Sequence, residues 1–190
     1  MKAIVLLSGG IDSAVCLAQA AREGRNVVAL HFQYGATHSS EGVAATMLAT
    51  RYKVPLEVVN LPLRLGASKL SVNPSGLQRG GVSPYFVPGR NLAFIALADN
   101  IAEVLGSNEI WVGFNADDYA GFPDCRREFI DSLQPHLHAR LRAPLLGQRK
   151  AEVVATARRL GVPIAITSSC YAGTACGECD ACVLRDEALR

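Results

Sequence analysis

MKAIVLLSGGIDS, residues 1–13, is the stretch that decides the fold. Residues 4–7 form a continuous apolar run without alternation, which is typical of a parallel strand that is buried on both faces. In the turn at 8–10, the two glycines carry no Cβ and so leave the backbone N–H groups uncovered. Asp12 and Ser13 lie at the start of a helical pattern. A strand, a glycine turn and a helix N-terminus in this order predict an anion-binding site, because the free amides and the helix dipole point the same way.

The composition is that of one ordinary domain, with 190 residues and a formal charge of +2. This near-neutral charge gives no indication of a nucleic-acid partner. No run approaches the roughly 18 apolar residues of a membrane span. Met1 leads directly into a strand, which leaves no room for a signal peptide. We therefore expect a cytoplasmic protein without a membrane partner, whose six cysteines are thiols or metal ligands rather than disulfides.

Strands and helices alternate along the rest of the chain. Further strands are predicted at 26–32, 56–61 and 109–114, and helices at 41–53, 91–105, about 124–135 and 150–160. We expect helix 41–53 to bury Val43, Met47, Leu48 and Tyr52, and helix 91–105 to lie between layers. The alternation predicts an α/β fold with a Rossmann-like parallel sheet and right-handed crossovers.

Polar stretches follow three of the four predicted strands. They are SGGIDS at 8–13, QYGATH at 33–38 and NADDYAGFPDC at 115–125. Ligands of such sheets bind at the carboxyl ends of the strands, so the three stretches are predicted to converge on one site. Residues 62–88 are rich in Pro, Gly and Ser without a clear period, which favours a lid or binding loop.

Four cysteines lie close together near the end of the chain. Cys170, Cys176, Cys179 and Cys182 have five, two and two residues between successive thiols. This density predicts a closed tetrahedral Zn²⁺ site with four thiolate ligands, and a site without an open position serves folding rather than chemistry. An iron–sulfur cluster is the alternative, because C-x-x-C-x-x-C also binds clusters.

SGGIDS resembles the pyrophosphate-loop signature SGGxDS of the ATP-pyrophosphatase (PP-loop) superfamily, whose members split ATP between the α- and β-phosphates. The P-loop of kinases is excluded by the absence of its Gly-Lys-Ser/Thr ending. The resemblance implies the fold of the adenine nucleotide alpha hydrolase type. It also implies that ATP is held by Ser8, Gly9, Gly10, Ile11, Asp12 and Ser13, with Asp12 helping to place Mg²⁺. The alternative is an ordinary Gly-rich turn.

Further segments, in order along the chain, are similar to the 7-cyano-7-deazaguanine synthase family. They are VPGRN at 87–91, DYAGFPDCRREF at 118–129, PLLGQRKAE at 144–152, and SCY with CGECDACVLR at the end. The resemblance implies a PP-loop ATP-pyrophosphatase α/β domain at 1–166 and a zinc-binding segment at 167–190 packed on the same domain. It further implies a homodimer that uses ATP with Mg²⁺ and a structural Zn²⁺.

Members of that family convert 7-carboxy-7-deazaguanine and ammonia to a nitrile through two adenylations. The catalytic candidates here are Asp12, Arg90 and Lys150, the last two as contacts to phosphate or carboxylate, or else as solvated cations. The substrate-binding candidates are Tyr34, His38, Asp118, Tyr119, Phe122 and Asp124. The two acids would accept from the N–H edge of the base, although Asp124 also suits a helix cap. The aromatic rings at 119 and 122 would stack on the base or simply pack in the protein. Cys125 is the free thiol near this site, and adenylate chemistry does not require it.

One stretch departs from the family pattern, which is close to DYGQRH. In QYGATH, Gln33, Ala36 and Thr37 replace an acid, a Gln and an Arg, and the loop at 62–88 is short for the family. A divergent enzyme that stops at the amide or adenylates another acid therefore competes with the synthase interpretation. A tRNA thiolase of the same superfamily also competes with it, as does a zinc-knuckle nucleic-acid-binding module on an inactive domain.

Overall fold

A five-stranded parallel sheet forms the centre of the computed structural model, which describes residues 1–36, 40–71, 80–173 and 175–190. The strands run β3-β2-β1-β4-β5 across the sheet. Their bounds are β1 Lys2–Leu6, β2 Asn26–Gln33, β3 Leu56–Asn60, β4 Glu109–Trp111 and β5 Arg140–Arg142. In the central register, Ile4 of β1 pairs with Val28 on one side and with Ile110 on the other. The predicted α/β class and parallel sheet are confirmed.

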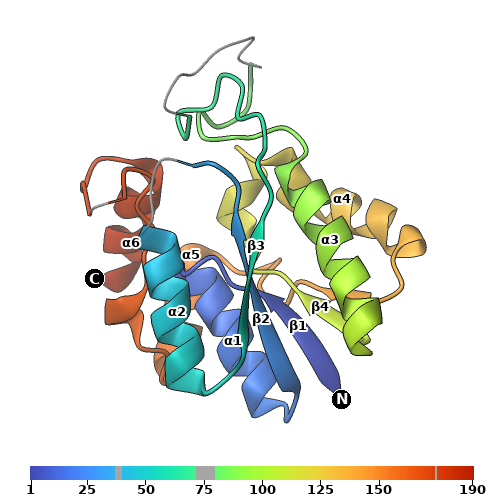
Figure 1. Ribbon diagram of the computed structural model, residues 1–190. Helices are drawn as coiled ribbons and strands as arrows, with labels where there is room; N and C mark the ends of the chain where they lie inside the picture. Colours follow the sequence, from blue (N-terminus) through green and yellow to red (C-terminus); the bar gives the residue numbers. More distant parts are fainter. Residues whose placement is uncertain (37–39, 72–79, 174) are drawn as a thin grey trace.

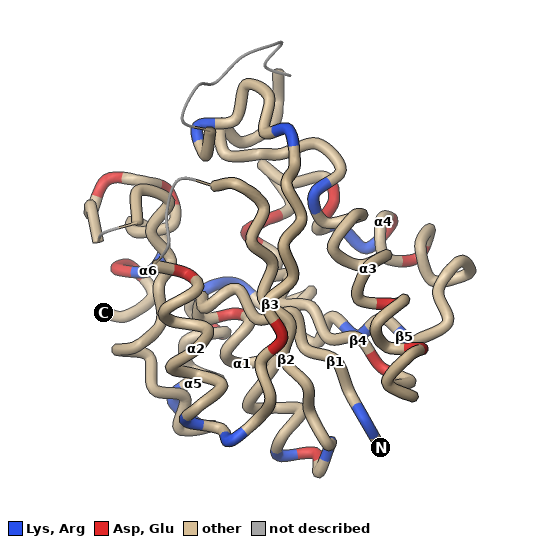
Figure 2. The backbone as a smooth tube through the Cα atoms, viewed as in Figure 1, with Lys and Arg blue, Asp and Glu red and all other residues tan. Residues whose placement is uncertain are grey.

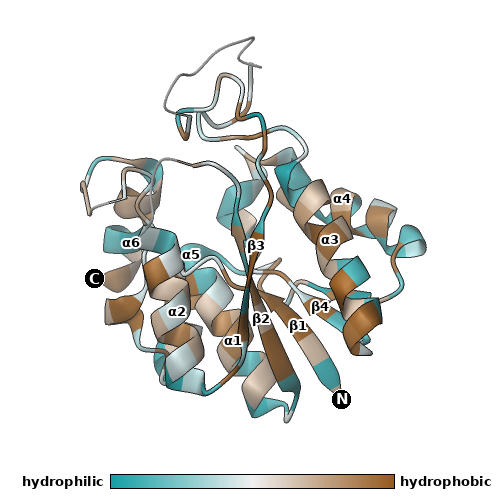
Figure 3. Cartoon of the chain, viewed as in Figure 1, coloured by the Kyte–Doolittle hydropathy of each residue, from teal (hydrophilic) through white to brown (hydrophobic). Residues whose placement is uncertain are grey.

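Helices cover both faces of this sheet (Figure 1). On one face lie α1 (Ile11–Arg22), α2 (Ser40–Tyr52) and α5 (Lys150–Arg159), followed by α6 (Asp180–Leu189). On the other face lie α3 (Arg90–Leu105) and α4 (Arg127–Leu133). Short 3₁₀ turns connect these elements: η1 Ala116–Tyr119, η2 Pro123–Cys125, η3 Gln134–His136 and η4 Ile164–Ile166. Figure 3 shows that the central strands β1 and β2 are largely hydrophobic, as burial between two helical layers requires.

The chain changes direction across the sheet between β1 and β4. The crossover through α1 places β2 on one side of β1, whereas the crossover through α3 places β4 on the other side. The carboxyl ends of β1 and β4 therefore face a crevice at a topological switch point, where α/β sheets bind their ligands.

Helix α2 corrects one prediction about the core. Val43 is 59% exposed and Met47 is 46% exposed, so these large apolar residues are not on the buried face. The buried face instead carries Leu48 together with the small residues Ala44, Ala45 and Ala49. Small side chains allow α2 to lie close against the turn that follows β1, which a face of large residues would prevent.

Helix α3 and two short elements also differ from the expectations. Helix α3 covers one face of the sheet rather than lying between two layers, and Val104 is 78% exposed. Strand β5 and helix α6 were not predicted, and the helix expected from about residue 124 starts as the η2 turn before α4. Within the described ranges, no helix is long and apolar enough to cross a membrane.

Candidate active site

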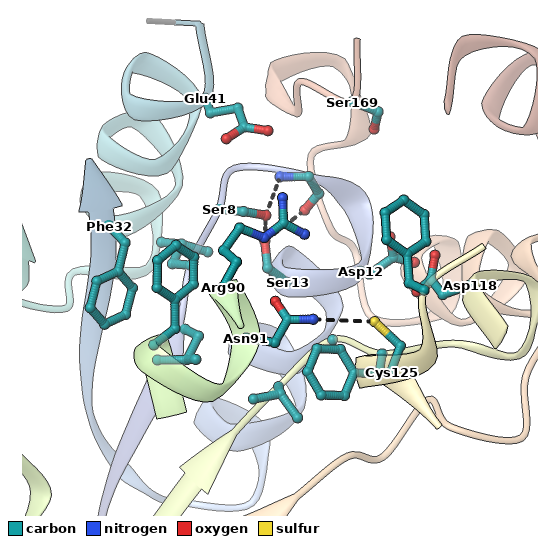
Figure 4. Close-up of a pocket in the computed structure, with 18 of the residues that line it drawn as sticks. Ser8, Asp12, Ser13, Phe32, Glu41, Arg90, Asn91, Asp118, Cys125 and Ser169 are labelled. Carbon is teal, nitrogen blue, oxygen red and sulfur yellow. Dashed lines mark hydrogen bonds between the residues drawn. The ribbon is translucent and has the colours of Figure 1, made fainter. Parts of the chain in front are cut away.

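A cavity of about 260 Å³ opens at the carboxyl ends of β1, β2 and β4. Its walls come from the turn after β1, the first turns of α2, α3 and α5, the η1–η2 region, the segment at 168–171 and helix α6. Figure 4 shows the polar side chains that point into it. The three polar stretches predicted to converge all contribute lining residues, with Ser8, Tyr34 and Asp118 as examples.

The turn after β1 is closed by its own hydrogen bonds. The Ser13 hydroxyl donates to the Gly10 carbonyl oxygen at 3.0 Å, and the Gly10 N–H donates to Ser8 Oγ at 3.3 Å. Ser8 Oγ lies 3.1 Å from Ser13 Oγ, and because the Ser13 proton is already donated, Ser8 is the donor in that pair. The loop is thus held in shape by its own residues, at the N-terminus of α1 (Figure 4).

Gly9 and Ile11 take part in this loop through the backbone. Gly9 has φ +97°, and a Cβ there would lie 2.5 Å from the Glu41 carbonyl oxygen and 2.9 Å from Ala44 Cβ. Only glycine fits this position. Ile11 is 1% exposed and packs in the core with α1, so its predicted contact with ATP is restricted to main-chain atoms.

Asp12 and Lys150, far apart in the sequence, meet at the cavity. Lys150 Nζ lies 2.6 Å from Asp12 Oδ2, and Asn115 Nδ2 donates to Asp12 Oδ1 at 3.3 Å. The first N–H of α5, that of Lys150, donates to Asp117 Oδ2 at 2.7 Å, which fixes α5 to the stretch after β4. Gly113 makes this approach possible, because a Cβ there would come within 2.9 Å of the Asp12 and Ser13 backbone.

Arg90 provides the second cation of the cavity. Its Nη1 donates to the Tyr34 hydroxyl at 3.5 Å, and the guanidinium carbon lies 5.6 Å from the centre of the Tyr34 ring. Burial works against the charge, but Tyr34, Asp124 and Glu41 together raise the pKa of Arg90. Burial also disfavours the charged form of Glu41 and so raises the pKa of this carboxyl. The positive charge of Arg90 offsets this rise only in part. Figure 4 shows Arg90 directed toward the loop at Ser8.

The region after β4 places a carboxyl and a thiol at the cavity. Burial and the nearby Asp12 charge raise the pKa of Asp118 to about 6, although Asp118 Oδ2 accepts the Asn115 N–H at 3.1 Å. Cys125 Sγ accepts from Asn91 Nδ2 at 3.4 Å, and burial raises the pKa of this thiol well above its usual range. Phe122 lines the cavity beside them.

Two predicted substrate residues, Tyr119 and Asp124, are not among those that line the cavity. The Tyr119 hydroxyl donates to the Leu146 carbonyl oxygen, so this side chain is engaged with the core beside α4. Asp124 is 9% exposed, and its Oδ1 has no hydrogen-bond partner among the described residues. Burial raises the pKa of Asp124, with Arg90 opposing. His38 lies outside the described residues.

The lining residues that were not predicted include the polar side chains of His31, Glu41, Asn91, Ser168, Ser169 and Tyr171. His31 Nδ1 lies 3.0 Å from the Leu7 carbonyl oxygen, which requires Nδ1–H as the donor and leaves Nε2 as an acceptor. A histidine inside an apolar strand was the available signal for this residue. The two serines directly precede Cys170, and the sequence there indicates only the cysteine motif.

The four cysteines come together as predicted. Their sulfur atoms all lie within 4.8 Å of one another, with Cys170 Sγ 3.5 Å and Cys182 Sγ 3.9 Å from Cys176 Sγ. A tetrahedral ion with bonds of about 2.3 Å requires sulfur separations of about 3.8 Å, so these residues fit one metal ion. Backbone N–H groups of Glu178 and Cys179 lower the pKa of Cys176 to about 6, whereas burial raises the pKa of Cys182 to about 12, so only the first shift favours the thiolate that a metal binds.

Comparison with known proteins gives one consistent result. The model of the family "Queuosine biosynthesis protein QueC" matches residues 2–190. A 7-cyano-7-deazaguanine synthase of Myxococcus xanthus is 40% identical, over 97% of this chain and 90% of that protein. One of Microcystis aeruginosa is 41% identical, over 99% and 90%.

A solved structure has the same fold at low sequence identity. The complex of a 4-thiouridine synthetase with RNA and bound ATP superposes with a TM-score of 0.60 and 21% identity. The match covers 98% of this chain but only 53% of the synthetase, so this chain spans about half its length.

Proposed function

The chain belongs to the QueC family of queuosine biosynthesis proteins and is an ATP-dependent enzyme of the 7-cyano-7-deazaguanine synthase kind; we propose how its own residues perform that reaction. The observation that carries the proposal is the meeting of the loop at 8–13, Arg90 and Lys150 in one cavity, which the Asp118 carboxyl also lines.

The proposed first step is adenylation of the substrate acid. A carboxylate oxygen of 7-carboxy-7-deazaguanine attacks the α-phosphorus of ATP, and pyrophosphate leaves. The amides of the loop and the hydroxyls of Ser8 and Ser13 hold the pyrophosphate, while Lys150 and Arg90 neutralise charge that develops on the phosphates. Ammonia then attacks the activated carbon, AMP leaves with its electron pair, and one proton is released to give the amide.

The second step repeats the activation on the amide. The amide oxygen attacks the α-phosphorus of a second ATP and pyrophosphate leaves. Loss of the N–H protons and departure of AMP then give the nitrile, so two ATP yield two AMP and two pyrophosphates. No side chain is modified covalently, which agrees with a Cys125 thiol that burial keeps protonated. Catalysis therefore rests on positioning and charge neutralisation.

The base is proposed to lie between Asp118, Phe122 and Tyr34. Asp118 accepts from the N–H edge of the deazaguanine when ionised, and the Phe122 ring stacks on its face. The deeper cavity wall is aromatic, with the Phe32 and Phe94 rings stacked at 4.3 Å, and would pack against the flat rings of a nucleotide.

Two metals are proposed. Asp12 is the residue to hold Mg²⁺, which supplies neutralisation of the triphosphate when bound. The four cysteines are assigned a structural Zn²⁺, and the close approach of their sulfurs favours one ion over an iron–sulfur cluster, whose thiolate ligands bind separate irons and lie farther apart.

Several finer assignments complete the proposal. Ammonia is taken from solution or a partner, the enzyme is a cytoplasmic homodimer, and nucleic acid is not a ligand. Figure 2 shows Lys and Arg scattered over both helical layers rather than gathered on one face, which supports the last point. Residues 167–190 are proposed to belong to the same domain as 1–166.

Mass spectrometry tests this function. The purified protein is incubated with ATP, Mg²⁺, ammonium and 7-carboxy-7-deazaguanine, and we expect the nitrile together with AMP. Amide as the final product would mean that the second adenylation is lost. AMP formation with the acid unchanged would point to another acid substrate. No cleavage of ATP with any acid would contradict the enzymatic proposal, and sulfur transfer to tRNA would replace it with a thiolase function.

A further inference from the structure

The segment at 167–171 forms a wall over the phosphate-binding loop. The Ser168 N–H donates to the Gly9 carbonyl oxygen at 2.9 Å, and the Ser168 hydroxyl donates to Ser40 Oγ at 3.2 Å. Ser168, Ser169 and Tyr171 all line the cavity. The placement of this segment therefore determines the shape of the space in which the triphosphate would lie.

One arginine holds this wall in place from helix α6. Arg185 Nη1 donates to Thr167 Oγ1 at 2.7 Å and lies 3.3 Å from Ser169 Oγ. Its Nη2 donates to the Ile164 carbonyl oxygen at 2.9 Å. Three acceptors on both sides of Ser168 are thus fixed by one rigid, planar guanidinium.

Helix α6 is itself fixed by the four-cysteine site. Cys179 is the residue before its first turn, and Cys182 lies in that turn. Arg185 follows Cys182 by three residues and therefore projects from the same side of the helix. An isolated helix of 10 residues is marginal in water, so α6 needs anchors, which are the cysteines at its start and the packing of Ala188 and Leu189 on the core at its end.

We propose that Arg185 is a positioning residue that couples the four-cysteine metal site to ATP binding. The metal orients the start of α6, Arg185 transfers that orientation to 164–169, and Ser168 sets the loop at Gly9. Coupling of this kind is reciprocal in binding free energy, so a bound nucleotide must also raise the affinity of the four-cysteine site for its metal. The inference rests on the proposed function only in taking ATP as the ligand of the loop.

The test uses Arg185→Ala in the metal-loaded full chain. The first measurement is calorimetric binding of α,β-methylene-ATP with Mg²⁺, an analogue that is not cleaved between its α- and β-phosphates. We expect roughly tenfold weaker binding or more, as for the loss of charge-assisted hydrogen bonds that hold a loop, with an unchanged metal content. The second measurement is the equilibrium competition between the protein and a chromogenic chelator for the metal. The analogue is expected to raise the metal affinity of the wild type but not that of the variant.

Arg158→Ala is the matched control. Arg158 Nη2 donates to the Leu189 carbonyl oxygen at 2.7 Å, so it also contacts α6, but at the end away from the loop. This variant is expected to keep both the nucleotide affinity and the rise in metal affinity on nucleotide binding. Arg185→Lys keeps the positive charge but loses the planar, two-nitrogen guanidinium, so its loss of nucleotide affinity should be intermediate. This variant provides the test of the coupling if Arg185→Ala does not fold.

Two outcomes separate this inference from the proposed function. Wild-type nucleotide affinity and an intact rise in metal affinity in the Arg185 variants would overturn the coupling, even if the enzyme makes the nitrile. Weakened binding in those variants, together with no nitrile from the wild type, would support the coupling and overturn the function.

Discussion

Strand β4 has a buried or half-buried group of charges at each end, and the two groups differ in how fully they are paired. At its start, the Glu109 side chain is 7% exposed and accepts from Arg25 Nε at 2.8 Å and Arg142 Nη1 at 3.1 Å. Trp111 Nε1 also donates to it at 3.1 Å. Hydrogen bonds from Arg25, then Trp111 and Arg142, lower the pKa of Glu109 to about 2, although burial works against this.

Past the other end of β4, the charges face the cavity and are incompletely satisfied. The Asp12–Lys150 pair is accessible to a ligand, and Asp118 has its pKa raised rather than lowered. One strand therefore has a fully paired group of charges at its amino end and an accessible group at its carboxyl end, where we propose that the reaction takes place. Full pairing stabilises the native state, whereas partial pairing leaves groups free to exchange partners when a substrate enters.

The largest expected effect is on catalysis, from Lys150→Met. Removal of this cation from the phosphate site should lower the rate of AMP formation by about 10²–10³-fold. The pair is partly exposed, so the free energy of unfolding should change by less than about 1 kcal/mol. Pyrophosphate exchange into ATP and urea denaturation measure the two quantities. Lys2→Met is the control, because Lys2 Nζ donates to the Leu105 carbonyl oxygen at the other end of the sheet. If Lys150→Met lost stability but kept the rate of AMP formation, the proposed difference between the two ends of β4 would be wrong.

The second effect is on stability, from Glu109→Gln. The change leaves Arg25 and Arg142 without their buried anion, so we expect a loss of about 3 kcal/mol, or roughly 6–12 °C in Tm, with the rate per folded molecule unchanged. Glu109 has a lowered pKa, so its contribution is present above the unfolded value of 4.5 and lost as pH falls toward 2. The difference between variant and wild type should shrink over that range. Glu23→Gln, which removes the exposed partner of the same two arginines, should cost less than about 1 kcal/mol.

The smallest effect is a gain in stability from Asp118→Asn. Burial disfavours the ionised carboxyl, so above pH 6 the folded state carries a charge that the unfolded chain holds more easily. In the absence of nucleotide and Mg²⁺, the variant should be more stable by about 2 kcal/mol at pH 7. The gain should disappear below about pH 4, where both states are protonated. Denaturation at a series of pH values measures this gain in stability. A gain that does not change with pH would contradict the proposed cost of ionising the buried Asp118 carboxyl. AMP formation should fall in the same variant.

The fold could be predicted from the sequence because one stretch, residues 1–13, contains a strand, a turn and a helix start with separate physical signals. Strand β5 was missed because its three residues include two arginines, one of which pairs with Glu109. Helix α2 was placed correctly, but its buried face was wrong because the prediction favoured large apolar residues. The observed face is mostly alanine because the helix approaches the loop closely.

The residues of the candidate site could be predicted where their side-chain type indicates a chemical role. They could not be predicted where the role depends only on where the fold places the residue. Asp12, Arg90 and Lys150 stood out as charges near glycine turns or helix starts, and the structure brings them to one cavity. Ser168 and Ser169 carry no such signal, because their role depends on a main-chain contact with Gly9 and on an arginine 16 to 18 residues away. Sequence patterns do not encode such long-range contacts, which arise only from the packing of α6 against the rest of the domain.

The tight contact between Gly9 and α2 also limits how this protein can evolve. Since a Cβ at position 9 would collide with Glu41 and Ala44, neither the loop nor that helix can accept bulk unless the other retreats in the same step. A single substitution that enlarges a side chain at Gly9 or on the facing side of α2 therefore gives a destabilised protein. New substrate preferences are therefore more accessible at Phe122 and Cys125, which line the cavity from another segment of the chain and can change size one at a time. Selection can vary that segment in single steps, whereas the loop changes only together with its helix.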